Sequence, residues 1–184
     1  MAANRIWLDI ETNGLDPRND AHIFEVGVIA TTADAEYREL ASQSWVVGWD
    51  VDDQWLRARM DPYVYQMHAK SGLLYEIPFG DPIATVEEQL CRFIDFFGNP
   101  APGRDPVGGA SVHFDTDWLK LHLPRVMKRF SHRTFDTSTL KQLFRDVGRG
   151  AELPGDDSPA HRTLADLRHC LAVARTVAGA VRRG

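Results

Sequence analysis

Three strand-like segments fill the first 47 residues, and no helical period separates them. Residues 5–10 (RIWLDI) and 22–32 (HIFEVGVIATT) are rich in bulky apolar side chains, and residues 36–47 form a more polar third segment. Asn13, Gly14 and Pro17 mark a turn after the first segment. The chain therefore begins with the strands of a sheet, and the residues that follow have to cover that sheet.

The remaining residues combine helical and strand-like patterns. In chain order, these patterns predict helical structure at 53–72 and 83–97, a strand at 106–113, a helix at 115–130 kinked at Pro124, a strand at 133–135, and helices at 136–147 and 164–181. Loops rich in Pro and Gly are expected at 99–105 and 148–159. This order predicts an α/β fold with one mixed sheet, and 184 residues suit a single domain spanning residues 1–184.

Composition excludes several classes of protein. The chain carries 21 Lys and Arg against 26 Asp and Glu, a formal net charge of −5, which argues against coating of duplex nucleic acid. Cys91 and Cys170 fall in apolar helical patterns and are expected to be buried thiols of a reducing compartment. A signal-peptide pattern and a bilayer-spanning apolar run are both lacking, so we expect a cytoplasmic protein without membrane contact.

Asp9 and Glu11 lie two residues apart at the end of the first strand-like segment. Strand alternation places both carboxylates on one face, with Cα atoms roughly 6.5–7 Å apart, and turns Ile10 to the opposite face. Two carboxylates held in this way can bind a divalent cation such as Mg²⁺ or Mn²⁺. The alternative is a pair of solvated charges at the rim of a sheet, because a D-x-E pair alone is a weak motif.

Three further polar residues make a site more specific. Asp115 follows the strand predicted at 106–113, and His161 and Asp166 bracket the start of the last helix. A step of five residues is about 140° around a helix, so His161 and Asp166 cannot share a regular helical face. Thr163 is a candidate N-cap with Asp166 at the third helical position, which leaves His161 in the preceding loop, free to turn toward Asp166. The simpler interpretations are a capping carboxylate and a loop histidine.

The order of Asp9, Glu11, Asp115, His161 and Asp166 resembles the DEDDh class of 3′→5′ exonucleases, which have a ribonuclease-H-like fold. The flanking segments are most similar to oligoribonucleases, which degrade very short RNA. The segments that carry the resemblance are DIETNGLDP (9–17), MDPYVYQMHAKSGL (60–73), SVHFDTDWL (111–119), HRTFDTSTLKQL (132–143) and HRTLADLRHCL (161–171). Together they span nearly the whole chain.

This resemblance implies a phosphodiester hydrolase that uses two divalent cations, Mg²⁺ or Mn²⁺. Asp9, Glu11, Asp115 and Asp166 are the four carboxylates available to hold the ions. Histidine titrates near neutral pH, so His161 is the candidate general base that accepts a proton from the attacking water.

The resemblance also implies contacts to a nucleic-acid substrate and a partner subunit. Leu15 is expected to lie as a wedge beside the terminal bases, with Tyr63 and His68 stacked on them, and Ser111, Arg133, Ser138 and Thr139 match positions that hold the 5′ phosphate. Helix packing is an equal alternative for Tyr63. The helix beginning near Ser138 can offer free N–H groups to an anion, but Ser138 and Thr139 can also simply cap it. Oligoribonucleases are homodimers, so a homodimer is implied.

The sequence departs from oligoribonucleases at three places. The segment DIETNGLD (9–16) is closer to proofreading-type DNA exonucleases than to the family's DLEMTGLD, Ala110 stands where the family has Asn, and His132 stands where an aromatic phenol reaches across the dimer interface. The resemblance as a whole implies a 3′→5′ exoribonuclease that acts on short single-stranded oligonucleotides, with RNA preferred to DNA. A 3′→5′ DNA exonuclease is the alternative, and a catalytically silent nucleic-acid-binding module is the third.

Overall fold

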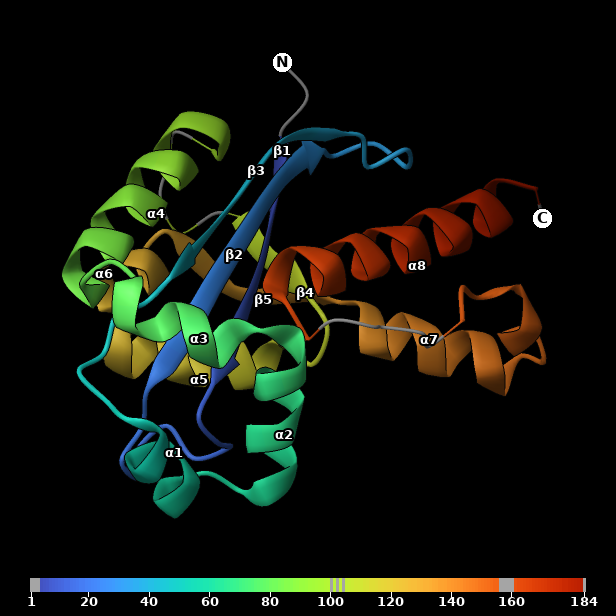
Figure 1. The fold of residues 1–184 in the computed structure, drawn as a ribbon. Coiled ribbons are helices and arrows are strands. Elements are labelled where there is room, and N and C mark those ends of the chain that lie inside the picture. Colours follow the sequence, from blue (N-terminus) through green and yellow to red (C-terminus); the bar gives the residue numbers. More distant parts are fainter. Residues whose placement is uncertain (1–3, 100, 102, 104, 156–160, 184) are drawn as a thin grey trace.

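A mixed five-stranded sheet forms the centre of the protein (Figure 1). The computed structural model describes residues 4–99, 101, 103, 105–155 and 161–183. The strands are β1 (Asn4–Thr12), β2 (Ile23–Thr32), β3 (Glu39–Val46), β4 (Asp105–Gly109) and β5 (Phe130–Asp136), in the order β3-β2-β1-β4-β5. The first three pair antiparallel, whereas β4 is parallel to β1 and β5 is parallel to β4. The expected α/β fold with a mixed sheet is confirmed.

Helices cover both faces of this sheet. Their bounds are α1 (Asp53–Arg59), α2 (Pro62–Ser71), α3 (Leu73–Glu76), the 3₁₀ turn η1 (Ile77–Phe79), α4 (Ile83–Phe97), α5 (Val112–His122), α6 (Pro124–Met127), α7 (Thr137–Asp146), the 3₁₀ turn η2 (Gly150–Glu152) and α8 (Thr163–Arg183). Helix α4 is strongly amphipathic and ends at Gly98, whose N–H donates to the Ile94 carbonyl, as its sequence predicts. Figure 1 shows α4 and α8 on opposite sides of the strands.

The alternation of β1 divides the core into two layers. Ile6, Leu8 and Ile10 are buried against α4, α5 and α6 on one face. Trp7 is buried on the other face in a cluster with apolar residues of α8, including Leu167 and Cys170. Each fully buried aliphatic side chain on either face contributes about 1.5–3 kcal/mol to folding. Because both faces are occupied, the register of β1 cannot slip, and this fixes the direction in which its polar residues point.

Two predicted segments differ from the structure. The strand expected at 106–113 ends at Gly109, and α5 begins at Val112 rather than at Asp115. The helix expected at 115–130 ends at His122, restarts at Pro124 as the short α6, and gives way at Phe130 to β5, which is longer than the predicted 133–135. Pro124 lacks the N–H that would continue α5, and Phe130 pairs with Asp105 of β4.

The arrangement of the strands gathers several polar segments at one edge of the sheet. Strands β1, β4 and β5 run in the same direction, so their carboxyl ends lie together, and α5 and α7 both begin there. This is the edge at which ligands bind in open α/β sheets. Within the described residues, no helix combines the length and apolarity needed to cross a membrane. Cys91 and Cys170 are both buried free thiols.

Candidate active site

Three carboxylates meet at the carboxyl end of β1. Oxygens of Asp9, Glu11 and Asp166 lie within 4.8 Å of one another, a spacing that one divalent cation can bridge. Ile10, between the two β1 acids, packs in the opposite core layer. The prediction that strand alternation places Asp9 and Glu11 on one face is therefore confirmed, and α8 adds the third carboxylate.

Helix α8 can bring Asp166 to this point because a glycine lies beneath its first residue. Gly27 of β2 pairs with Asp9 across the sheet, and a methyl group at position 27 would clash with the Thr163 side chain. The expected capping role of Thr163 is wrong: Thr163 is the first residue of α8, and its buried hydroxyl has no hydrogen-bond partner. This hydroxyl lies over Gly27, on the side of α8 that faces the sheet.

Asp115 lies beside the three-carboxylate cluster, in the first turn of α5. It is buried, and its Oδ1 accepts a hydrogen bond of 3.2 Å from the Ile10 N–H. Ile10 lies between Asp9 and Glu11 in the chain, so this hydrogen bond places Asp115 beside the two acids of β1. The fold therefore brings all four predicted carboxylates to one end of β1.

Burial and mutual repulsion make this site unfavourable for negative charge. Burial, followed by the charges of Asp115, Glu11 and Asp166, raises the pKa of Asp9 well above its ordinary value. Burial, and then the charges of Asp166 and Glu25, raise the pKa of Glu11 to about 8, and burial raises that of Asp115 to about 8. Like-charged carboxylates in a buried site share protons unless a cation neutralises them, and such perturbed groups are typical of active sites.

His161 lies at the entrance to α8 in a conformation that is rare for a residue with a side chain. Its φ angle is 42°, in the left-handed region, which costs on the order of 1 kcal/mol or more for a non-glycine residue. It is half-buried and immediately precedes Arg162, whose side chain binds Glu25 of β2. Because Glu25 pairs with Glu11 across β1 and β2, His161 lies in the segment that borders the carboxylate cluster.

The expected stacking role of His68 does not fit the structure. His68 is 0% exposed, its Nε2 donates to the Thr12 carbonyl over 2.9 Å, and its ring packs edge-on against Phe24. Burial lowers its pKa, so the ring is neutral and its Nδ1, which has no hydrogen-bond partner, faces Glu11 as an acceptor. His68 joins α2 to the end of β1, and the ring has no free face for a base.

Leu15 and Tyr63 have the exposure that contact with a substrate requires. Leu15, in the turn after β1, is 82% exposed, and Tyr63, in the first turn of α2, is 69% exposed. The exposure of Tyr63 argues against helix packing as its role. The His68 hydrogen bond to Thr12 holds α2 against the end of β1 and so brings both segments to the carboxylate edge.

The expected phosphate-binding residues are organised by a carboxylate that the sequence reasoning missed. Asp136 caps α7 by accepting the Ser138 N–H at 2.8 Å, and it also accepts the N–H groups of Ser111 (3.1 Å) and Val112 (3.0 Å). The hydroxyls of Ser111 and Ser138 lie 3.3 Å apart. The alternative that Ser138 and Thr139 cap α7 is therefore wrong, and the Ser138 N–H is already occupied. Arg133 and Thr139 are both exposed.

Glu25 and Arg162 are two further residues of this region that the sequence reasoning passed over. Glu25 pairs with Glu11 across β1 and β2 and is 2% exposed, and Arg162 binds it through two hydrogen bonds. The signal that could have identified Glu25 is its position as a single charge inside the otherwise apolar segment HIFEVGVIATT.

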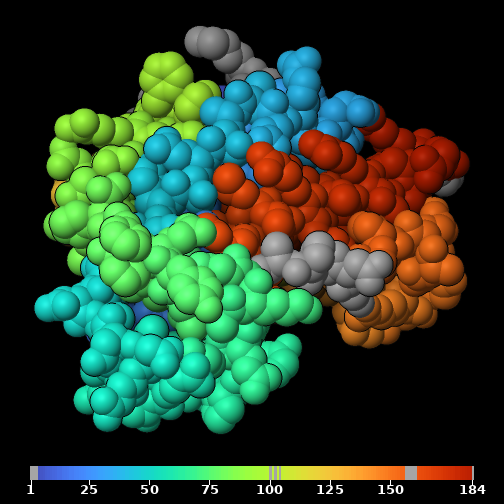
Figure 2. Space-filling view, in the orientation of Figure 1, coloured from blue at the N-terminus to red at the C-terminus, as the bar shows by residue number. Residues whose placement is uncertain are grey.

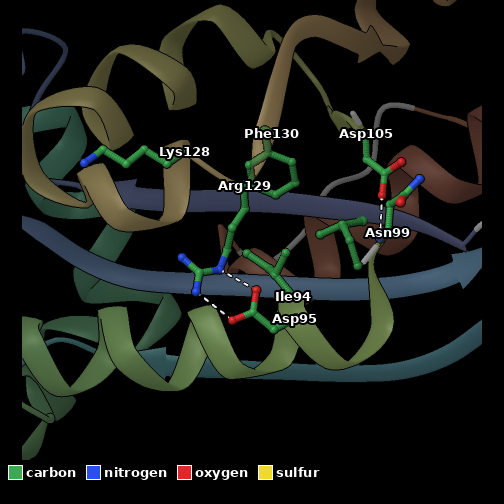
Figure 3. Close-up of a pocket in the computed structure, with 8 residues that line it drawn as sticks. Ile94, Asp95, Asn99, Asp105, Lys128, Arg129 and Phe130 are labelled. Carbon is green, nitrogen blue, oxygen red and sulfur yellow. Dashed lines mark hydrogen bonds and ion pairs between the residues drawn. The ribbon is translucent and has the colours of Figure 1, made fainter. Parts of the chain in front are cut away.

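A cavity of about 450 Å³ lies at the other end of the sheet, where β4 and β5 begin (Figure 3). Its lining includes Ile6 and Phe130, and Arg129 closes one side through a bidentate pair with Asp95 at 2.7 and 2.6 Å. Asp105 accepts the Asn99 N–H. Lys128 also lines the cavity, but the cavity lies at the opposite end of the sheet from the carboxylates, so it adds no group to the carboxylate site.

Solved structures of exonuclease I share this fold. A product-bound exonuclease I matches 100% of the chain with a TM-score of 0.69 and 14% sequence identity, and E. coli exonuclease I with a dT13 oligonucleotide matches 100% with a TM-score of 0.70 and 14% identity. The chain spans less than half the length of these proteins, 45% and 42%. The chain thus has the fold of exonuclease I, with carboxylates at the end of its first strand.

Comparison with the sequences of known proteins identifies the family of this chain. The oligoribonuclease of Bordetella pertussis is 31% identical over 171 residues, which are 91% of either chain, and that of Pseudomonas syringae pv. tomato is 34% identical over 94% of this chain and 92% of the relative. The mitochondrial oligoribonuclease of Mus musculus is 30% identical over 91% of this chain and 68% of its own length. A search against protein-family models gives no match. The chain belongs to the oligoribonuclease family.

Proposed function

We propose that this protein is a 3′→5′ exoribonuclease that hydrolyses short single-stranded oligoribonucleotides to 5′-mononucleotides. The observation that carries the proposal is the convergence of Asp9, Glu11 and Asp166 from two distant segments, with Asp115 beside them, in a family whose relatives are named oligoribonucleases. The exposed Leu15 and Tyr63 near the same edge provide apolar surfaces for bases, and such stacking tolerates any sequence.

The carboxylate cluster fits divalent cations. Its oxygens are hard ligands close together, and the raised pKa values of Asp9, Glu11 and Asp115 reflect repulsion and burial that a cation would relieve. We assign the four carboxylates as ligands of two ions, Mg²⁺ or Mn²⁺. When bound, such ions neutralise the phosphoryl oxygens, activate water and stabilise the leaving alkoxide.

The chain's own residues supply the remaining chemistry. His161, half-buried at the start of α8, accepts the proton of the attacking water as general base. The 5′ phosphate is held by Arg133, which offers five N–H donors in a planar fork, and by the neighbouring hydroxyls of Ser111 and Ser138. Thr139, which follows Ser138 on α7, is exposed beside them in the chain. Leu15 and Tyr63 hold the bases at the 3′ end. A site that grips both ends of its substrate selects short oligomers.

A side-by-side digestion of RNA and DNA oligomers, from dinucleotides to twenty-mers, tests this function with and without Mg²⁺ or Mn²⁺. We expect metal-dependent release of 5′-mononucleotides, with kcat/KM for RNA dinucleotides exceeding that for twenty-mers by about tenfold or more, equivalent to about 1.4 kcal/mol of transition-state binding. Equal kcat/KM values for short and long RNA would contradict the proposed contacts to the 5′ phosphate.

The same digestion tests a second candidate. The DIETNGLDP segment resembles proofreading-type DNA exonucleases, and the fold is shared with exonuclease I structures that contain DNA oligonucleotides. Faster hydrolysis of DNA than of RNA at matched length would favour a 3′→5′ DNA exonuclease. Discrimination depends on contacts to the 2′-OH, which DNA lacks.

We also propose that the protein is a cytoplasmic homodimer. Strand β5 is an edge of the sheet, and His132, Arg133 and Thr134 on it are exposed. An exposed strand edge is a ready surface for pairing with a second chain, and the resemblance to oligoribonucleases implies that His132 lies at the dimer interface. Buried thiols at Cys91 and Cys170 suit a reducing compartment. Sedimentation equilibrium is expected to give twice the chain mass of 20.7 kDa, and a single-chain mass would exclude the dimer.

A further inference from the structure

Arg162 is the single residue between the candidate base His161 and the first residue of α8, Thr163. Its side chain binds two carboxylates that lie on different elements. Its Nε and Nη2 atoms bind Glu25 of β2 at 3.0 and 3.1 Å, and its Nη1 and Nη2 atoms bind Glu76 of α3 at 2.8 and 3.0 Å. A planar guanidinium can satisfy two carboxylates in this way, whereas an ammonium cannot. Figure 2 shows the surfaces of α3 and the first turns of α8 in contact on this face.

This double ion pair is partly shielded from water. The side chain of Glu25 is 2% exposed and that of Arg162 is 26% exposed, so the Arg162–Glu25 pair is not an ordinary surface salt bridge, whereas Glu76 is 48% exposed. Glu25 also accepts the Thr163 N–H at 3.2 Å, so one carboxylate holds both the side chain of Arg162 and the first N–H of α8. The start of α8 is thereby tied to β2 at the residue opposite Glu11.

The backbone of Arg162 connects the loop that contains His161 to the first turn of α8. The Arg162 carbonyl accepts the N–H groups of Ala165 and Asp166, which opens the first turn of α8, while His161 immediately before it adopts a φ of 42°. A sparsely populated conformation persists only where surrounding contacts hold it. The contacts of Arg162 with Glu25 and Glu76 fix the position of the residue that directly follows His161, and so restrain the His161 backbone.

We propose that Arg162 is a positioning residue that, through Glu25 and Glu76, holds His161 in its left-handed conformation and so sets the general base against the carboxylate site. This inference rests on the proposed role of His161 as general base. The ion pairs of Arg162 are with Glu25 and Glu76, which are not among the carboxylates assigned to the ions. Its second effect is electrostatic, because it neutralises Glu25, whose charge otherwise adds to that of the cluster.

The test is a set of variants assayed on an RNA dinucleotide with Mn²⁺. We expect Arg162→Gln to lower kcat by about 10- to 100-fold, the range for loss of an outer-shell partner, with KM changed by less than about threefold. Arg162→Lys keeps the charge but cannot bind both carboxylates bidentately, so its kcat is expected to fall between those of Arg162→Gln and the wild type. Arg168→Gln, which breaks the exposed pair with Glu39 on the same helix, is the matched control and is expected to retain wild-type kcat.

A double-mutant cycle separates positioning from general damage to the fold. If Arg162 acts through His161, Arg162→Gln adds less than about a twofold loss in the His161→Ala background, because contributions of residues that act as a unit are not additive. Glu25→Gln/Arg162→Gln removes the unpaired buried charge, and it is expected to recover thermal stability but not kcat. Wild-type kcat in Arg162→Gln, or the full loss again in the His161→Ala background, would overturn the proposal.

NMR relaxation gives a readout that does not depend on activity. In the wild type, the backbone order parameter at residue 161 is expected near the rigid value of about 0.85, and in Arg162→Gln below about 0.6. An unchanged order parameter in the variant would overturn the positioning role. Wild-type protein without metal-dependent nuclease activity on RNA or DNA would instead contradict the proposed function, and the NMR result would still decide whether Arg162 holds residue 161.

Discussion

Replacing His161 with Ala is expected to lower kcat on an RNA dinucleotide by about 10²- to 10⁴-fold, the contribution of a general base. The imidazole is the group placed to accept a proton at the start of α8, whereas the surrounding carboxylates are assigned to cations. Because His161 is not assigned to the ions, the rise in Tm produced by saturating Mn²⁺ is expected to match that of the wild type. Steady-state kinetics and thermal unfolding on the same preparation measure the two effects.

His169→Ala is the matched control for this substitution. His169 lies on α8 beyond Asp166 and has no assigned role in catalysis, so its removal is expected to leave kcat within a fewfold of the wild type. Unchanged turnover in His161→Ala would remove the general-base assignment. Loss of the Mn²⁺-induced rise in Tm would show that His161 is needed for cation binding as well.

Glu11→Gln is expected to abolish most activity and, in the absence of metal, to stabilise the fold. The activity loss should be at least the 10- to 100-fold that follows loss of an outer-shell partner, because Glu11 is assigned as a direct ligand. Stabilisation is expected because a neutral amide removes one of several buried like charges. Function and stability conflict at this position.

The pH dependence of Tm measures this conflict directly. The folded pKa of Glu11, about 8, lies above its ordinary value of 4.5, so the folded state binds more protons than the unfolded state between these pH values. Stability of the metal-free wild type therefore falls as pH rises from about 5 to 8, by up to about 1.4 kcal/mol for each pH unit per group. Glu11→Gln is expected to flatten this fall, and Mg²⁺ is expected to raise the wild-type Tm more at pH 8 than at pH 5.

Glu39→Gln is the matched control for Glu11→Gln. Glu39 lies on β3, and its pair with Arg168 lowers its pKa, so its loss is expected to cost little stability and to leave nuclease activity and the pH slope unchanged. A metal-free Tm that rises with pH between 5 and 8 in the wild type would show that the carboxylates do not repel one another as the structure implies.

The four candidate carboxylates could be predicted from the sequence, Asp9 and Glu11 by a local rule and Asp115 and Asp166 by the order of motifs along the chain. The alternation of β1 and the identity of its apolar residues place Asp9 and Glu11 opposite Ile10, and the structure has this arrangement. Asp115 and Asp166 were predicted by their order along the chain, and each lies in the first turn of a helix. Helix boundaries were less predictable where a long-range pairing competed with local preference, as at Phe130, which pairs with β4 instead of extending the helix.

By itself, the sequence predicted the type of fold, the face on which the β1 acids project and the four candidate carboxylates, because strand alternation is a property of neighbouring residues and motif order can be compared with that of a known family. Only the tertiary structure decided that His68 is buried against Thr12, that Asp136 joins the starts of α5 and α7, and that Arg162 binds Glu25 and Glu76. The Arg162 contacts join residues 137 and 86 positions apart. The free energy of such a contact depends on burial and on which partner lies across the sheet, and a local pattern contains neither.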